Sequence, residues 1–249
     1  MNITKPLQDL GQYCLFMGRV LSTPQKWKLF FKRTLNEIYK LGIDSVPLVI
    51  IISVFIGAVI TIQMELNISS PLLPAYAIGM STREIIVLEF SSTIVCLILA
   101  GKVGSNIASE IGTMRVTEQI DALEIMGVNS ANFLVLPKLT GFLAIIPFLC
   151  AISMGTSILG ALGICYFTGI VSISKFIFGL QSFFIEWYVW YSIIKSAIFS
   201  IIITSVASYF GYYVKGGALD VGKASTQAVV NSSIFILFFD VLLTNLMLQ

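Results

Sequence analysis

The chain has 249 residues, of which 57% are hydrophobic and only 11% are charged, and its mean hydropathy is +0.92. This composition lies far outside that of soluble domains, so we predict one all-α integral membrane domain over residues 1–249. The net charge of +2 is too small to indicate a nucleic-acid partner, and the absence of histidine removes the commonest general base and metal ligand.

Residues 1–44 precede the first long apolar run, and part of this segment has an amphipathic pattern. The apolar positions are Trp27, Phe30, Phe31, Leu35, Ile38 and Leu41, and the basic positions are Lys26, Lys28, Lys32, Arg33 and Lys40. Helical spacing of the apolar positions predicts an amphipathic helix in the cytoplasmic interface of the membrane, where anionic headgroups attract lysine. A cytoplasmic helix docked on the rest of the protein explains the pattern too, and both interpretations stay open.

Residues 45–249 contain five apolar runs, which we predict to be transmembrane helices. They cover residues 46–63, 85–107, 139–168, 187–214 and 232–248. The first run measures roughly 27 Å as a helix, enough for one crossing of the hydrocarbon core. Pro147 lies inside the third run, where we expect a kink and not a helix end. Small residues spaced four apart predict close helix packing; these pairs are Ser53 and Gly57, Ala151 and Gly155, and Ser157 and Ala161.

Basic residues flank the runs unequally, and this asymmetry predicts the orientation. Twelve of them fall on one side, namely Lys5, Arg19, Lys26, Lys28, Lys32, Arg33, Lys40, Lys102, Arg115, Lys138, Lys215 and Lys223. Only Arg83 and Lys175 fall on the other side, and Lys195 lies within the fourth run. The excess places the N-terminus in the cytoplasm and the C-terminus outside, as an odd number of crossings requires.

The segment between the second and third runs predicts a short cytoplasmic helix. Thr117 is a candidate N-cap, Glu118 then faces the helix dipole, and Gly127 is a C-terminal stop, which leaves two to three turns. The apolar stripe is formed by Val116, Ile120 and Leu123, and the polar positions are Glu118, Gln119, Asp121 and Glu124. Such a helix suits docking in a groove of another protein, and a helix lying on the membrane surface fits equally well.

Residues 100–139 resemble a known family. The segment EIGTMRVTEQIDALEIMGV, preceded by AGKVGSNIASE and followed by LVLPKL, is similar to the signature of the MlaE, YrbE and TGD1 family of ABC-transporter permeases. The order of the apolar runs on both sides also agrees with that family. The residues Asp121, Ala122, Leu123 and Gly127 resemble the EAA loop with which importer permeases contact their ATPases. The departures from the family pattern are Lys102, Lys138 and Ser130.

The resemblance implies a membrane-spanning permease of an ATP-driven transporter that moves phospholipid between an inner membrane and an outer membrane or envelope. It implies a homodimer in the inner (cytoplasmic) membrane of a double-membraned bacterium, with a separate ABC ATPase, an MCE-type substrate-binding protein and, as an optional member, a small STAS-type regulatory subunit. The ATPase would bind ATP and magnesium, so we expect no cofactor, metal site or catalytic residue in this chain. The implied coupling residues are Glu110, Arg115, Glu118, Gln119, Asp121, Glu124 and Gly127.

Charged residues inside the apolar runs mark the candidate substrate path. A charge near the bilayer centre costs about 2.5–3.5 kcal/mol on insertion scales, so Glu89, Lys195 and Asp240 are expected to face a cavity or a partner. The resemblance adds Arg83 and Glu84 to this path. An ion pair between Lys195 and Asp240 that only fastens two helices together is the alternative, and Glu89 could be protonated in apolar surroundings.

Other functions fit the sequence less well. Residues 217–224, GALDVGKA, nearly match a phosphate-binding loop, but Ala224 replaces the hydroxyl residue that would bind magnesium and an apolar helix precedes the loop. We interpret them as a cytoplasmic turn. A proton-coupled carrier using Glu89 and Asp240 would be expected to show paired interrupted spans, and an intramembrane enzyme would need a nucleophile with a base; neither pattern is present. A structural anchor does not explain the buried charges.

Overall fold

The computed structural model describes residues 4–24, 26–68 and 74–248, and these are helical almost throughout, with no strand among them. Five of the helices are long and apolar enough to cross a membrane, which confirms the predicted all-α membrane fold. They cover Trp27–Ile68, Tyr76–Val116, Ser130–Thr168, Glu186–Tyr212 and Ala218–Leu248. The third continues through Pro147 without interruption, as expected for a proline whose freed carbonyl is satisfied by its surroundings.

The chain's residues form two compact units, which are described separately. Unit 1 comprises residues 1–43, 97–145 and 199–239, and unit 2 comprises residues 44–96, 146–198 and 240–249. The long helices α8 (Ser130–Thr168), α10 (Glu186–Tyr212) and α11 (Ala218–Leu248) contribute residues to both units.

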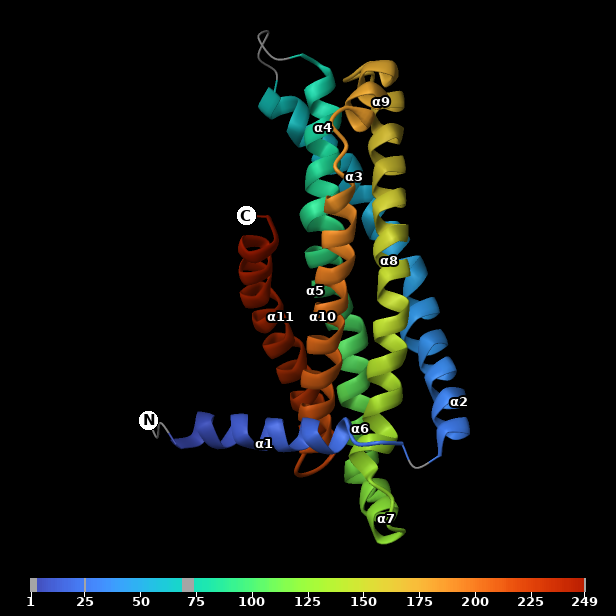
Figure 1. Ribbon diagram of the computed structural model, residues 1–249, viewed down its shortest axis with the longest axis vertical. Helices are drawn as coiled ribbons and strands as arrows, with labels where there is room; N and C mark the ends of the chain where they lie inside the picture. Colours follow the sequence, from blue (N-terminus) through green and yellow to red (C-terminus); the bar gives the residue numbers. More distant parts are fainter. Residues whose placement is uncertain (1–3, 25, 69–73, 249) are drawn as a thin grey trace. The chain divides into compact units, whose positions relative to one another are not determined.

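Unit 1 contains α1 (Thr4–Val20), α2 (Trp27–Glu37), the π-helical turns η1 (Ile38–Gly42) and η4 (Ala100–Gly104), α6 (Ser105–Val116) and α7 (Gln119–Ile125). Helix α1 crosses the end of α10, and α7 follows α6 at its far end (Figure 1). The ring of Phe16 is buried against Tyr209, Tyr212 and Tyr213, and this aromatic group fastens α1 to α10.

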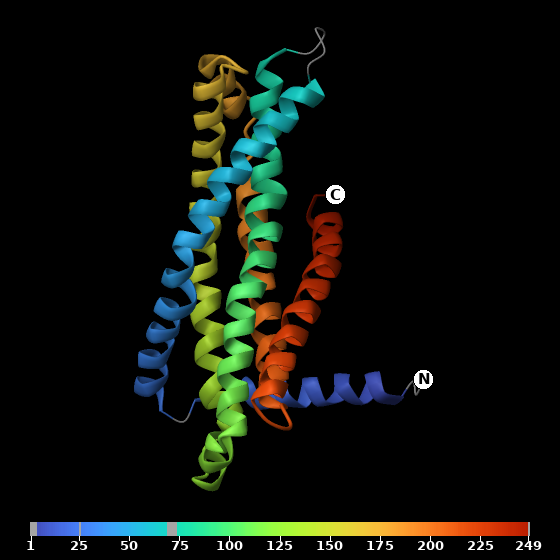
Figure 2. The same ribbon diagram turned by 180° about the vertical axis from the view of Figure 1, so that it is seen from behind.

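Unit 2 contains the 3₁₀ turn η2 (Ile43–Ser45) from Asp44 onward, α3 (Val46–Ile68), α4 (Tyr76–Ile85), the π-helical segment η3 (Ile86–Ile94) and α9 (Ile173–Gln181). The short α5 (Val95–Leu99) lies at its boundary with unit 1. Helices α4 and α9 lie side by side in Figures 1 and 2. Their backbones touch, because a Cβ on Gly179 would lie 2.1 Å from the carbonyl oxygen of Tyr76.

The predicted small-residue packing is present between α3 and α8. A Cβ on Gly57 would lie 2.0 Å from the carbonyl oxygen of Ser157, so only glycine allows this approach. The hydroxyls of Ser53 and Ser153 lie 2.9 Å apart at the same interface. Gly155, by contrast, has nothing within 4 Å of its Cβ position, so this member of a predicted pair is not at a close contact.

The N-terminal region differs from the prediction in two ways. The amphipathic segment does not end before the first span, because Trp27–Ile68 is one continuous helix of 42 residues. At about 1.5 Å per residue this helix is roughly 63 Å long, about twice the thickness of the hydrocarbon core. The apolar run in the sequence therefore shows which part of the helix crosses the membrane, but not where the helix begins and ends. In addition, α1 is a second N-terminal helix that the sequence pattern did not indicate.

Candidate functional site

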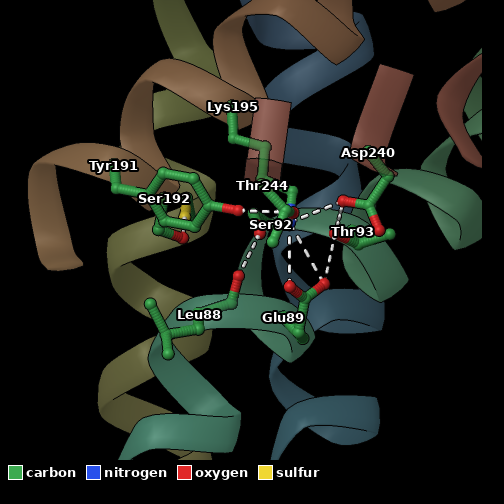
Figure 3. A network of polar contacts seen from close by, with 10 residues as sticks. Leu88, Glu89, Ser92, Thr93, Tyr191, Ser192, Lys195, Asp240 and Thr244 are labelled. Atoms are coloured by element: carbon green, nitrogen blue, oxygen red, sulfur yellow. Dashed lines mark hydrogen bonds and ion pairs between the residues drawn. The ribbon is translucent and has the colours of Figure 1, made fainter. Parts of the chain in front are cut away.

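Lys195 is the centre of a charged cluster in unit 2 (Figure 3). Its Nζ lies 2.5 Å from Oδ1 of Asp240 and 3.1 Å from both carboxylate oxygens of Glu89. The lysine side chain is completely buried, whereas the side chains of Asp240 and Glu89 are 17% and 43% exposed. The cluster therefore presents a carboxylate, and not the ammonium group, at its accessible side.

Hydroxyl groups complete the cluster. Oγ1 of Thr93 lies 2.8 Å from Asp240 and 3.2 Å from Glu89, and Lys195 donates to Oγ1 of Thr244 at 3.3 Å. A threonine hydroxyl has one hydrogen and cannot donate to both carboxylates at once. With one ammonium for two carboxylates, the cluster carries a formal charge of −1.

Helical spacing explains how these side chains come together. Glu89 and Thr93 are four residues apart on η3, and Asp240 and Thr244 are four residues apart on α11, so each pair shares one face of its helix. Lys195 projects from α10 between them (Figure 3). The expected pair of Lys195 with Asp240 is present, but the sequence did not indicate that Glu89 bonds to the same lysine.

Arg83 and Glu84 form a different group of unit 2. Arg83 is only 4% exposed and donates to the carbonyl oxygens of Leu180, Ser182 and Phe183 at 2.8, 2.7 and 3.2 Å, and its Nη2 lies 3.5 Å from Glu84. Phe183 has a φ of 51°, a left-handed conformation that the guanidinium group supports. The arginine thus holds the chain after α9, and its place on the substrate path stays a prediction.

A second charged cluster lies in unit 1. Lys138 is buried, and its Nζ lies 2.8 Å from Glu37 and 3.0 Å from Glu110. Lys40 adds a second cation 2.6 Å from Glu110, so two ammonium groups meet two carboxylates. The expected coupling residue Glu110 thereby links α6 to η1 and α8. No sequence pattern indicated this cluster, because its ion pairs join residues 28 to 101 positions apart.

The short helix after α6 is present, with a different start. Thr117 is not the N-cap, because its hydroxyl donates back to the carbonyl of Thr113 at 2.8 Å. Glu118 occupies the N-cap position with a left-handed φ of 60°. Gly127 ends the helix as predicted: it has a φ of 74°, and the adjacent Val128 N–H bonds to the carbonyl of Leu123.

The apolar stripe of α7 faces the protein. Ile120 is fully buried, and Val116, just before α7, packs against Val214, Val221 and Ala224. The stripe is therefore not free to enter a groove of a partner. The exposed apolar residues are instead Ile125 and Met126 at the end of α7, with 87% and 68% exposure.

Four of the predicted coupling side chains bond within unit 1. Arg115 contacts Asp121 at 2.6 Å, and the amide of Gln119 donates to Thr117. Glu124 accepts hydrogen bonds of 2.8 Å from the hydroxyls of Tyr212 and Ser130. These two donors, Tyr212 first, lower the pKa of Glu124 from its ordinary value of 4.5. The bonds fasten the end of α7 to α8 and α10.

Comparison with protein families assigns the chain to a family. The family model described as permease MlaE matches residues 34–246. The chain belongs to the MlaE permease family. It is 33% identical over 247 residues to a probable ABC transporter permease protein of Rickettsia bellii, covering 96% of this chain and 92% of the relative.

Other relatives of this MlaE-family permease come from photosynthetic organisms. A probable ABC transporter permease protein of Synechocystis is 31% identical over 221 residues, covering 88% of this chain and 82% of the relative. The chloroplastic protein TRIGALACTOSYLDIACYLGLYCEROL 1 of Arabidopsis thaliana is 27% identical over 252 residues, covering 94% of this chain and 67% of the relative. The chain is therefore a multi-pass ABC permease, and an ABC permease works with an ATPase subunit.

Proposed function

We propose that this permease carries phospholipid between an inner membrane and an outer membrane or envelope, driven by a partner ATPase that does all ATP hydrolysis. The proposal includes a homodimer in the inner membrane, an MCE-type substrate-binding protein and a small STAS-type subunit. The observation that carries it is the cluster around Lys195, because a charged cluster inside the apolar helices is costly unless it serves a polar substrate group. Lipid supplies such a group together with tails that suit apolar walls.

Within the cluster, Glu89 is the group best placed to meet a headgroup. Its side chain is 43% exposed, whereas Lys195 is buried and bonded to both carboxylates. A phosphate would reach Lys195 only by displacing a carboxylate. The cationic part of a zwitterionic headgroup therefore approaches Glu89 first, and Lys195 holds this carboxylate in place.

The distribution of charge supports a cytoplasmic N-terminus and an outer C-terminus. Unit 1 contains twelve basic and seven acidic residues, and unit 2 contains three basic and six acidic residues, so their formal charges are +5 and −3. All twelve basic residues that the topology assigns to the cytoplasmic side belong to unit 1. Since α7 also belongs to unit 1, we assign its end, with Ile125 and Met126, as the contact for the ATPase.

The test is co-purification of the permease with its ATPase, followed by lipid transfer in reconstituted vesicles. Replacing Ile125 and Met126 by serine should abolish ATPase co-purification and ATP-driven transfer while the permease still inserts. Leu15→Ser is the matched control, because Leu15 is 71% exposed on α1 and is not part of the assigned contact. An intact complex in the double variant would remove α7 from the coupling role.

The same cluster favours a second candidate, a proton-coupled carrier of an amphiphilic substrate. Two carboxylates share one ammonium group and the single hydroxyl hydrogen of Thr93, so Glu89 and Asp240 are the groups that a proton-coupled carrier would use. In vesicles that contain the permease without an ATPase, transfer that follows a pH gradient would support this carrier. Transfer that requires the ATPase and ATP, and that is indifferent to the gradient, supports the ABC transporter.

A further inference from the structure

Unit 1 contains a cavity of about 550 Å³, and its lining residue Arg33 also lies near Glu37 and Glu110 of the Lys138 cluster. It lies where the segment between α1 and α2 passes the end of α7 and the beginning of α8. Its lining residues are Ser22, Thr23, Pro24, Lys26, Leu29, Phe30, Arg33, Leu123, Met126, Val128, Asn129, Asn132, Phe133 and Pro137. This volume is in the range of sites that bind small ligands.

Two asparagines, Asn132 in α8 and Asn129 in the turn before it, hold part of the cavity wall in place. The amide of Asn132, which is 7% exposed, donates to the carbonyls of Val20 and Ser22 at 2.8 and 2.5 Å. The amide of Asn129 donates to the carbonyl of Arg19 and the hydroxyl of Ser22, both at 3.0 Å. The end of α1 and Ser22 after it are thus fixed by four bonds, and this part of the cavity has a defined wall.

The lining combines positive charge with apolar surface. Lys26 and Arg33 are its charged members, and none of the described residues that line it is acidic. Arg33 stacks on Phe133, with its guanidinium carbon 3.7 Å from the ring centroid, and Nη1 donates to the Phe133 carbonyl at 2.8 Å. This geometry fixes the plane of the guanidinium group. An occupant that matches the lining has an anionic head and an apolar part.

The helix that forms one wall also has the features of a membrane-interface helix. Trp27, Phe31 and Leu35 of α2 are 59%, 60% and 66% exposed, and the exposed Lys28 and Lys32 lie between them. Aromatic rings beside lysines are typical of the boundary between headgroups and acyl chains. An anionic lipid of the surrounding leaflet is therefore the anionic amphiphile nearest to the cavity.

We propose that this cavity binds the phosphate headgroup of an anionic phospholipid through Lys26 and Arg33, as a regulatory site distinct from the transport path. Leu123 and Met126 at the end of α7 form its other wall, so an occupant fixes the segment that we assign to the ATPase. Lipid binding itself does not depend on the proposed function, whereas its effect on the ATPase does.

The first experiment measures lipid retention by the permease alone. Protein purified from mixed phosphatidylglycerol and phosphatidylcholine micelles is analysed by native mass spectrometry. The variant Lys26→Glu with Arg33→Gln should lose its preference for phosphatidylglycerol, by about fivefold for each basic contact removed. Lys28→Glu with Lys32→Gln is the matched control, because it makes the same charge change on α2 outside the cavity. Equal retention by the two variants overturns the proposal.

Two additions keep the test independent of folding and of the ligand's source. Leu29→Trp fills the cavity without changing charge and should also reduce retention of phosphatidylglycerol, so normal retention by this variant speaks against the cavity. Inorganic phosphate at millimolar concentration should leave the bound lipid in place. Displacement by phosphate would assign the site to a soluble anion and overturn the lipid assignment.

The second experiment uses the complex with its ATPase in nanodiscs. Addition of phosphatidylglycerol should change ATPase activity in the wild type and in the Lys28 and Lys32 control, but not in the Lys26 and Arg33 variant. Loss of ATPase binding by the cavity variant would show instead that this surface is a protein contact, which contradicts the lipid site. Lipid retention without any ATPase binding in the wild type would contradict the proposed function and leave the lipid site intact.

Discussion

Unit 1 and unit 2 each bury one lysine against two carboxylates, and the two clusters differ in their balance of charge. Around Lys138, a second lysine, Lys40, neutralises the additional carboxylate. Around Lys195, no second ammonium group is present among the described contacts, and Glu89 remains 43% exposed. A cluster whose charges balance serves to fasten helices, whereas a cluster with an accessible unbalanced carboxylate is suited to a ligand. The difference distinguishes a structural cluster from a site.

The largest expected effect comes from removing either lysine. Lys195→Met leaves Asp240 and Glu89 without their cation, and Lys138→Met does the same to Glu37, which costs about 3–5 kcal/mol for a buried pair. Both variants should unfold at much lower temperature in detergent, measured by the thermal midpoint. If either variant keeps the wild-type midpoint, its lysine is not part of a buried ion pair.

Repair of the two clusters sharpens the comparison. In unit 1, Lys138→Met with Glu37→Gln should recover stability and, since this cluster is structural, lipid transfer. In unit 2, Lys195→Met with Asp240→Leu and Glu89→Gln should recover stability but not lipid transfer or bound phospholipid, because the headgroup contact is lost. Full transfer by the unit 2 repair would show that the Lys195 cluster is only a fastening.

Backbone packing provides the next comparison. Gly57→Ala in unit 2 places a methyl group 2.0 Å from the Ser157 carbonyl oxygen, so the helices must separate, at about 1–3 kcal/mol. Gly104→Ala in unit 1 meets Ile203 at an ordinary 3.5 Å and gains helix propensity, so its stability should be unchanged or higher. Thermal midpoints of the two variants check this. Equal midpoints would mean that α3 and α8 are less closely packed than the structure shows.

The two units were also predictable to different degrees. Apolar runs and small-residue spacing identified the five membrane helices and Gly57 as a position of close packing, but not its partner helix α8, because only the first two depend on local composition. The start of α7 and the α1 helix were missed, because tertiary contacts such as that of Phe16 with the tyrosines of α10 decide them. Of the partners of Lys195 only Asp240 was predicted, and those of Lys138 were not predicted, since pairing across 28 to 106 residues leaves no local signal. A charged residue inside a membrane-spanning helix predicts that it has a partner, but it does not predict which residue that partner is.

The smallest expected effect lies at an exposed contact of unit 1. Hydrogen bonds from Tyr212 and Ser130 lower the pKa of Glu124 below its ordinary value of 4.5, so the ionised carboxylate stabilises the folded protein above that pH. This contribution is lost as the pH falls through the lowered pKa. Glu124→Gln should therefore lower the free energy of unfolding at neutral pH by less than about 1 kcal/mol, since the carboxylate is exposed. The thermal midpoint should fall slightly, and its difference from wild type should shrink below pH 4.5. Tyr212→Phe removes the main donor and should reproduce this pH dependence, and the double variant should be no less stable than the weaker single one. A difference that is constant with pH would show that Glu124 acts through packing and not through its charge.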